Sequence, residues 1–449
     1  MKKLTALLCL VLALVSLSAL AADADTETTL WPAYDPETGL WGYIREDGAW
    51  GIEPQYGYAG HFHDGCAAAG TASPETGMEA QGVIDKNGAY LLSPEYLVVD
   101  HCSNEDNIAY GVTGVFLVSK GGMKGWFNAE NRYFSGVQWD YAWTQQGWPV
   151  MCVGQGFLYG YLDRFTGEPI VPIETCGRRP DEYSEGFFTV TFHGVEHAVL
   201  LDMQGQEIVF PEGIHVEAES VMRCGLVAVE NEAGLMGYAD AQGRIVIEPQ
   251  YSFAMDFDGG FAEVFHPERG FLLIDSEGCV VYESDNNWSF HGVVDGSAFI
   301  YPTLGAPFLL NADGTVRMTT TVPAFSYAAW YQEPLVEGAP IRLQAGLVGN
   351  SYWCFVDKNG QPSTTWWDRP ADFGSLCLDG QGWQAVTKAT GIPAWGYVDA
   401  WGKTVIPYQF YAAEDFQGNL ALVCLDKSTQ GYINRSGEIV YQWPMPEEE

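Results

Sequence analysis

An internal repeat is the feature that most limits what this chain can fold into, because self-similarity every ~20 to 50 residues is typical of repeat architectures. Residues 40–56 (LWGYIREDGAWGIEPQY), 235–251 (LMGYADAQGRIVIEPQY) and 394–410 (AWGYVDAWGKTVIPYQF) are versions of one sequence, and residues 81–96 are a fourth. Aligned on the residue that closes a turn, eleven units follow, at Gly48, Gly88, Asn131, Gly167, Gly205, Gly243, Gly278, Gly314, Gly360, Gly402 and Gly437. These units leave no room for a separate catalytic domain.

The sequence of each unit predicts roughly three short β-strands and no helix. The alternation of aromatic and aliphatic residues in 41–44 (WGYI) is typical of a half-buried strand. An Asp or Asn then opens a turn, and glycine takes the left-handed conformation that closes it, as Asn131 is expected to do in the third unit. A second strand should end at a proline such as Pro54 or Pro249, because proline donates no hydrogen bond to a ladder. A third apolar run follows, as in 225–229 (GLVAV).

The recurring WGY, D-x-x-G and V-I-x-P-x-Y segments resemble the WG-repeat family, whose short β-rich repeats are common in bacterial secreted and surface proteins. The resemblance covers about residues 40–441 and implies no catalytic or ligand-binding residue. We interpret a set of recurring residues as structural repeat positions: Trp41, Gly48, Gly88, Gly243, Trp395 and Gly402.

A single unit cannot bury its own aromatic face, so neighbouring units must stack. We therefore expect an all-β fold, a tandem array of about eleven β-hairpin-containing repeats with an open elongated or curved shape. One or two β-propeller-like rings are the alternative arrangement.

The N-terminus predicts export. Lys2 and Lys3 precede an apolar run that ends in small residues near Ala21, the pattern of a cleaved signal peptide. We divide the chain into a signal peptide (1–22), a lead-in segment (23–39), the repeat array (40–441) and an acidic tail (442–449). The mature protein should be secreted, with at most a noncovalent association with the cell surface.

The charge limits the partners. There are 58 acidic against 21 basic residues, a formal net charge of −37, so nucleic acid is excluded because its phosphates would be repelled. We expect an extracellular protein or a neutral glycan as partner, a protein that is not membrane-embedded, and a monomer. No cofactor is predicted; Ca²⁺ would suit the charge, but no calcium-loop motif is present.

Catalytic and metal-binding patterns are weak. Glu53 and Glu248 recur at one repeat position, which favours solvated or locally paired carboxylates over sugar hydrolysis. On a strand, His61 and His63 would share a face and could bind a metal together with Asp64, but a further ligand at motif spacing is missing. We therefore assign no catalytic and no metal residue.

Tryptophans outside the repeat pattern are the candidate ligand-binding residues. Exposed rings beside polar groups are typical of sugar-binding surfaces, whereas packing under loops is the commoner role of such a side chain. The candidates are Trp139, Trp143, Trp148, Trp330, Trp366 and Trp367.

Three functions follow from these observations. The first is a non-enzymatic binding or scaffold protein of a bacterial cell surface or exterior, since repeat arrays present broad surfaces. The alternatives are a glycan-active enzyme with a carboxylate pair in a diverged repeat, and a self-assembling structural protein of the envelope.

Overall fold

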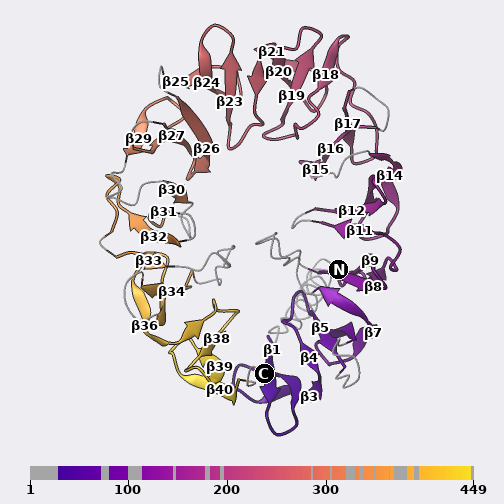
Figure 1. Ribbon diagram of the computed structural model, residues 1–449, viewed down its shortest axis with the longest axis vertical. Helices are drawn as coiled ribbons and strands as arrows, with labels where there is room; N and C mark the ends of the chain where they lie inside the picture. Colours follow the sequence, from indigo (N-terminus) through magenta and orange to yellow (C-terminus); the bar gives the residue numbers. More distant parts are fainter. Residues whose placement is uncertain are drawn as a thin grey trace, which may run out of the picture.

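In the computed structural model every regular element of the described residues is a β-strand (Figure 1). The structure describes residues 29–71, 80–99, 114–144, 148–176, 183–192, 197–284, 287–303, 306–319, 329–332, 338–347, 350–363, 365–368, 382–388 and 394–445. The expected signal peptide and the last four residues of the acidic tail lie outside these ranges. The described part of the chain has no helix of the length and hydropathy needed to cross a membrane.

The strands form nine antiparallel sheets in which hydrogen-bonded neighbours follow chain order. The first five sheets contain β1 (Trp31–Asp35), β2 (Leu40–Ile44) and β3 (Trp50–Tyr56); β4 (Tyr58–Ala59), β5 (Cys66–Gly70), β6 (Gln81–Asp85), β7 (Tyr90–Val99), β8 (Val115–Lys120), β9 (Met123–Asn128) and β10 (Tyr133–Phe134); β11 (Tyr141–Trp143), β12 (Val150–Gln155), β13 (Leu158–Asp163) and β14 (Pro169–Cys176); β15 (Tyr183–Ser184), β16 (Phe187–Val190) and β17 (Val199–Asp202); and β18 (Ile214–Val216), β19 (Leu226–Asn231), β20 (Met236–Asp240) and β21 (Ile245–Tyr251).

The remaining four sheets have the same connectivity. They contain β22 (Phe253–Ala254), β23 (Phe261–His266), β24 (Gly270–Asp275) and β25 (Val280–Glu283); β26 (Trp288–Val294), β27 (Ser297–Pro302), β28 (Phe308–Leu310) and β29 (Val316–Thr319); β30 (Ala329–Gln332), β31 (Ile341–Leu347), β32 (Asn350–Val356), β33 (Trp367–Asp368), β34 (Gln384–Lys388), β35 (Trp395–Val398) and β36 (Thr404–Phe410); and β37 (Ala412–Ala413), β38 (Leu420–Cys424), β39 (Thr429–Asn434) and β40 (Ile439–Pro444). Each seven-stranded sheet spans two repeats.

The WG glycine is required by a close approach between two strands. The register of β20 and β21 shifts on both sides of Tyr238, and a Cβ on Gly237 would lie 2.3 Å from the carbonyl oxygen of Ile247. The proline of the next strand lies at this irregularity. Pro249 is inside β21 and does not end it, contrary to the sequence prediction, and Pro54 likewise lies inside β3. A bulge tolerates proline because the regular ladder is already interrupted there.

The predicted turns are confirmed. The carboxylate of Asp240 accepts hydrogen bonds from the backbone N–H groups of Gln242 (2.9 Å) and Arg244 (3.0 Å), and Gly243 has a φ of +74°. In the third unit the left-handed residue is Arg132 (φ +58°) and not Asn131. Its turn is one residue longer than most, like the turn that Gly167 closes after Asp163.

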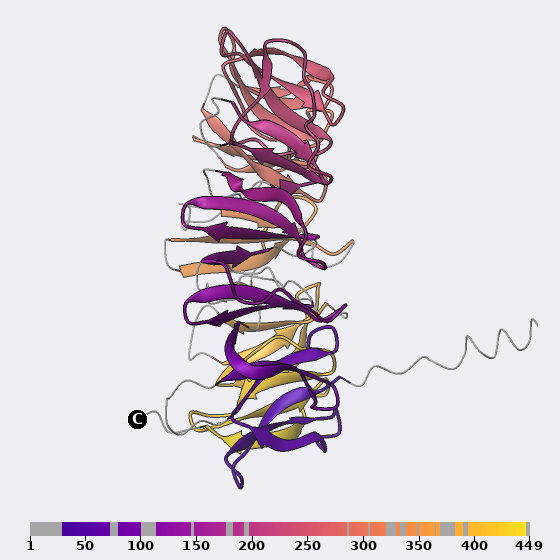
Figure 2. The same cartoon turned by 90° about the vertical axis from the view of Figure 1, so that its right-hand side faces the viewer.

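The sheets follow one another around an oval ring, and the two ends of the array meet (Figure 1). Seen from the side, the strands run across the thickness of this ring (Figure 2). The hydroxyl of Tyr238 donates to the carbonyl oxygen of Met255, just after the first strand of the next sheet. In the last sheet Tyr432 donates in the same way to Pro32 in β1, at 2.9 Å.

Apolar contacts also join the first and last sheets. Trp31 and Ala33 of β1 form one buried cluster with Leu420, Tyr432 and Trp443 of the last sheet. The all-β class and the tandem array are thus confirmed, and these contacts fit the single propeller-like ring. They also place part of the expected lead-in segment, residues 31–35, in the first sheet.

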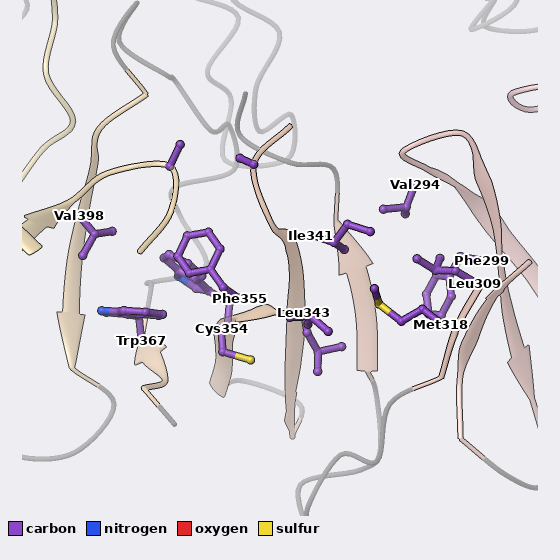
Figure 3. Close-up of a cluster of buried hydrophobic side chains, with 14 of the residues drawn as sticks. Val294, Phe299, Leu309, Met318, Ile341, Leu343, Cys354, Phe355, Trp367 and Val398 are labelled. Carbon is purple, nitrogen blue, oxygen red and sulfur yellow. The ribbon is translucent and has the colours of Figure 1, made fainter. Parts of the chain in front are cut away.

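The core lies between successive sheets. One cluster is formed by residues of the β26–β29 sheet, such as Phe299, and residues of the next sheet, such as Leu343 and Phe355 (Figure 3). Each sheet therefore buries its apolar faces against its two neighbours, as stacked repeats must.

Candidate functional site

Three of the six tryptophans predicted to bind sugar, Trp139, Trp148 and Trp367, are buried. Trp139 is 6% exposed and stacks on Trp126 with the ring centroids 5.0 Å apart. Trp148 is 8% exposed and meets the partly buried Trp143 edge to face, also at 5.0 Å. Because Trp139 and Trp148 are buried, their rings are unavailable for stacking on a sugar.

The second tryptophan group is also part of the core. Trp367 is 3% exposed, stacks on Trp353 at 4.8 Å and donates its indole N–H to the hydroxyl of Tyr408. Figure 3 shows Trp367 among the buried side chains, and Trp366 packs against the same cluster. Trp330 lies in β30, and the surroundings of its side chain lie outside what the structure describes.

The WG tryptophans are structural, as the alternation predicted. Trp395 is buried in a cluster with Tyr397 and Phe410. Trp41 is partly buried and packs at the junction between the first and last sheets, where its ring meets that of Trp443.

A recess between two neighbouring sheets is the best candidate for a functional site. It has a volume of about 560 Å³ and lies between the loop that joins β18 to β19 and the segment that joins β21 to β23. Its lining combines carboxylates, one guanidinium group and apolar side chains: Glu217, Glu219, Ser220, Arg223, Met236, Phe253, Ala254, Met255, Asp256, Phe257 and Asp258.

A hydrogen-bond chain fixes one wall of the recess. The backbone N–H of Ala228 donates to Ser220 Oγ (2.9 Å), and this hydroxyl donates to Asp256 Oδ1 (2.6 Å). The N–H of Val221 also contacts both carboxylate oxygens of Asp256, at 3.2 Å. Because Asp256 comes from one sheet and its donors from the preceding one, these bonds hold the two sides of the recess together.

The environment of Asp256 raises its pKa. Burial is the main cause, since it disfavours the charged form, and the hydrogen bonds from Ser220 and Val221 and the charge of Arg223 offset only part of the effect. The corresponding carboxylate near the C-terminus, Asp415, accepts a hydrogen bond from the N–H of Ala385 at 2.7 Å. Asp256 thus has a structural role that recurs in the ring.

The apolar part of the lining is unusually exposed. Phe253 is 42% exposed and Met255 is 50% exposed. In the copies that match this repeat most closely, the position of Met255 is occupied by Gly60 and Glu414. Our sequence analysis did not predict this site. The sequence signal that could have indicated it is Met255, an apolar residue at a repeat position that is otherwise small or charged.

The residues that the sequence analysis weighed as metal ligands or catalytic acids do not line the recess. Among the residues that the structure describes, no three His, Cys, Asp or Glu side chains converge as metal ligands, and this statement includes His61, His63 and Asp64. Glu53 and Glu248 are exposed on outer strands of different sheets.

The fold and the recess define a β-repeat protein with a ring of stacked sheets and a recess between two of them. The chain contains WG repeats: the family model described as "WG containing repeat" matches residues 41–69, 236–265 and 395–427. The second match includes the recess segment that carries Phe253, Met255 and Asp256.

A comparison with curated proteins finds no match. Solved structures similar to this chain include a eukaryotic initiation factor, with 10% identity, a TM-score of 0.41 and coverage of 74% of this chain and 95% of that one. BamB from Moraxella catarrhalis has 12% identity, a TM-score of 0.30 and coverage of 75% and 92%. AztD from Citrobacter koseri has 11% identity, a TM-score of 0.29 and coverage of 66% and 90%. The ring described above rests on its own contacts, not on these similarities.

Proposed function

We propose that this protein is a secreted, non-enzymatic binding or scaffold protein of a bacterial cell surface or exterior, and that its partner is another protein. The WG repeats support the general role of a repeat binding or scaffold protein. The observation that carries the specific proposal is the recess, because it combines exposed apolar side chains, Phe253 and Met255, with several polar groups. Protein interfaces have this anatomy, an apolar centre with a polar rim.

A protein partner is favoured over a neutral glycan. Stacking on sugar needs exposed aromatic faces, and three of the six tryptophans on which the glycan alternative depended, Trp139, Trp148 and Trp367, are buried. The recess offers one exposed aromatic ring, Phe253, beside flexible thioether groups that adapt to the side chains of a partner.

The test is capture of a partner protein by the wild type and by a variant that lacks the exposed apolar side chains of the recess. The full mature chain and its Phe253→Ser/Met255→Ser variant are each immobilised and exposed to envelope and culture-medium fractions of the native host. Both positions are exposed, so we expect the variant to fold and to lose a specific partner that the wild type retains. Retention of the same proteins by both forms would exclude the recess as the binding surface.

Localisation is tested separately. An antibody against the protein should detect it in the medium or on the cell exterior, with the first 22 residues absent from the mature N-terminus. Recovery of the uncleaved chain inside the cell would contradict the proposal of secretion.

A further inference from the structure

The charge of the recess points to the chemistry of what it binds. Four carboxylates line it, from Glu217, Glu219, Asp256 and Asp258, against the single guanidinium of Arg223. Glu219 and Asp258 are exposed, Glu217 is partly buried, and Asp256 is held between the two sheets by its hydrogen bonds. The local charge is therefore negative, and the net charge of −37 of the chain strengthens the attraction for a cation.

The geometry favours an organic cation over a metal ion. A divalent metal needs several ligand groups that converge on one point, and the described residues contain no such group of three. Two of the carboxylates already accept hydrogen bonds within the protein, Glu217 from the backbone N–H of Glu219 at 2.8 Å and Asp256 from Ser220 at 2.6 Å. Because no three of them converge on one point, the arrangement suits a cationic head on a long side chain better than a metal ion.

The apolar lining supplies the rest of such a site. Phe253, Met255 and Met236 line the same recess as the carboxylates. The stem of a lysine or arginine side chain packs on apolar surface while its head stays near charge and water, and a cation is also attracted to the face of an aromatic ring. The volume of about 560 Å³ exceeds what one such side chain fills, so it has room for neighbouring residues of the same segment.

Resting on the proposed function, we propose that the recess binds a lysine or arginine side chain, together with an adjacent apolar side chain, from an extended segment of the partner protein. Asp258 and Glu219 attract the cationic head, and Phe253 and Met255 contact the stem and the apolar neighbour.

The experiment is calorimetric titration of the full mature chain with the capped peptide Gly-Leu-Lys-Leu-Gly and with a second peptide that has norleucine in place of lysine. We expect saturable binding of the lysine peptide and at least about tenfold weaker binding of the norleucine peptide. The affinity should fall as sodium chloride rises from about 50 mM to about 500 mM.

Two double variants distinguish the effect of the recess carboxylates on peptide affinity from the effect of the overall charge. Glu219→Gln/Asp258→Asn removes two charges from the recess, and Glu53→Gln/Glu248→Gln removes two exposed charges elsewhere. We expect the first variant to lose about tenfold or more in affinity and the second to change it less than about twofold. Thermal melting of both variants verifies that they are folded.

Two results would overturn the inference. An equal loss of affinity in the two double variants would mean that peptide binding depends only on the overall charge of the protein. Equal affinity for the lysine and norleucine peptides would mean that the cation is not recognised. Neither result affects the proposed function, because capture of a partner through Phe253 and Met255 is measured independently.

Discussion

At the scale of single residues, most acidic side chains that recur in the repeat serve the backbone. Asp357, for example, accepts hydrogen bonds from the N–H groups of Asn359 (2.8 Å) and Gln361 (2.9 Å). These bonds favour the ionised form, and they lower the pKa of Asp357. Asp256 differs, because its burial between two sheets raises its pKa. The contributions of these two aspartates to stability therefore change with pH in opposite directions.

This difference predicts opposite pH effects for two matched variants. Because the folded-state pKa of Asp256 is raised, the folded protein binds more protons than the unfolded chain between the two pKa values, and the contribution of Asp256 to stability falls as pH rises through that interval. The contribution of Asp357 has the opposite sign and is lost as pH falls through its lowered pKa. Asp256→Asn should therefore become more stable relative to the wild type as pH rises from about 4 to about 7.

Urea denaturation of the wild type and both variants, at low protein concentration, measures these differences. Asp357→Asn provides the control, since its stability relative to the wild type should change in the other direction, mainly at the acidic end. Subtraction from the wild type cancels the titration of distant carboxylates. Parallel pH curves for wild type and Asp256→Asn would contradict our account of Asp256.

Some properties of these residues were predictable from the sequence, and others were not. The role of Asp240 as a turn cap and the left-handed glycines were predictable, because local hydrogen bonding and sterics decide them. The burial of Trp139 and Trp367 was not predictable from spacing, since it depends on how neighbouring sheets meet. The recess was missed for the same reason: Asp256 and Ser220 are 36 residues apart.

At the scale of elements, the repeat was predicted with the correct strands but with incomplete sheets. The run 225–229 is the core of β19, which pairs with β20 of the WG hairpin that follows it. A first strand was overlooked in several units because strands such as β22 and β37 have only two residues. No periodicity can be recognised over two residues, so most sheets have four strands where three were expected.

The WG hairpin itself yields a prediction. Gly237→Ala places a methyl group against the carbonyl oxygen of Ile247 and the nitrogen of Pro249, at nominal distances of 2.3 Å and 2.7 Å. The strands must separate, and we expect a loss of about 1 to 3 kcal/mol in the free energy of unfolding, as for overpacked cores. Urea denaturation measures this loss. Gln242→Ala, exposed on the same hairpin, is the control, and a loss no larger than that of the control would contradict the close-approach explanation.

At the scale of the whole molecule, the repeat allowed both an open array and a ring, and only contacts distant in sequence distinguish them. The contacts that turn glycines make with a neighbouring unit are of this kind. Gly243 packs against the carbonyl oxygen of Val209 in the preceding unit, and Gly48 of the first unit packs in the same way against Val440 of the last. The indole N–H of Trp31 also donates to the carbonyl oxygen of Gln417 at 2.9 Å. The first and last sheets therefore meet as any two successive sheets do.

This equivalence predicts that one substitution has the same effect at the junction and elsewhere in the ring. Tyr432→Phe removes the hydrogen bond to Pro32, and Tyr238→Phe removes its counterpart to Met255. Each buried bond contributes about 1 kcal/mol. Because the expected effect is confined to one strand, hydrogen exchange resolved by peptide is the suitable measurement. Tyr432→Phe should accelerate exchange in β1 by about fivefold, a factor that corresponds to this energy.

The matched variant is what makes the measurement decisive. Tyr238→Phe should accelerate exchange by a similar factor around β22 and leave β1 unchanged. If Tyr432→Phe left β1 unchanged while Tyr238→Phe acted on β22, the two ends of the array would be separate in solution. Equal effects would mean that the two ends are held by the same kind of hydrogen bond as the junction at Tyr238. The recess between the sheets of β18 and β22 would then belong to a ring held on both sides, a rigid support for the binding surface we propose.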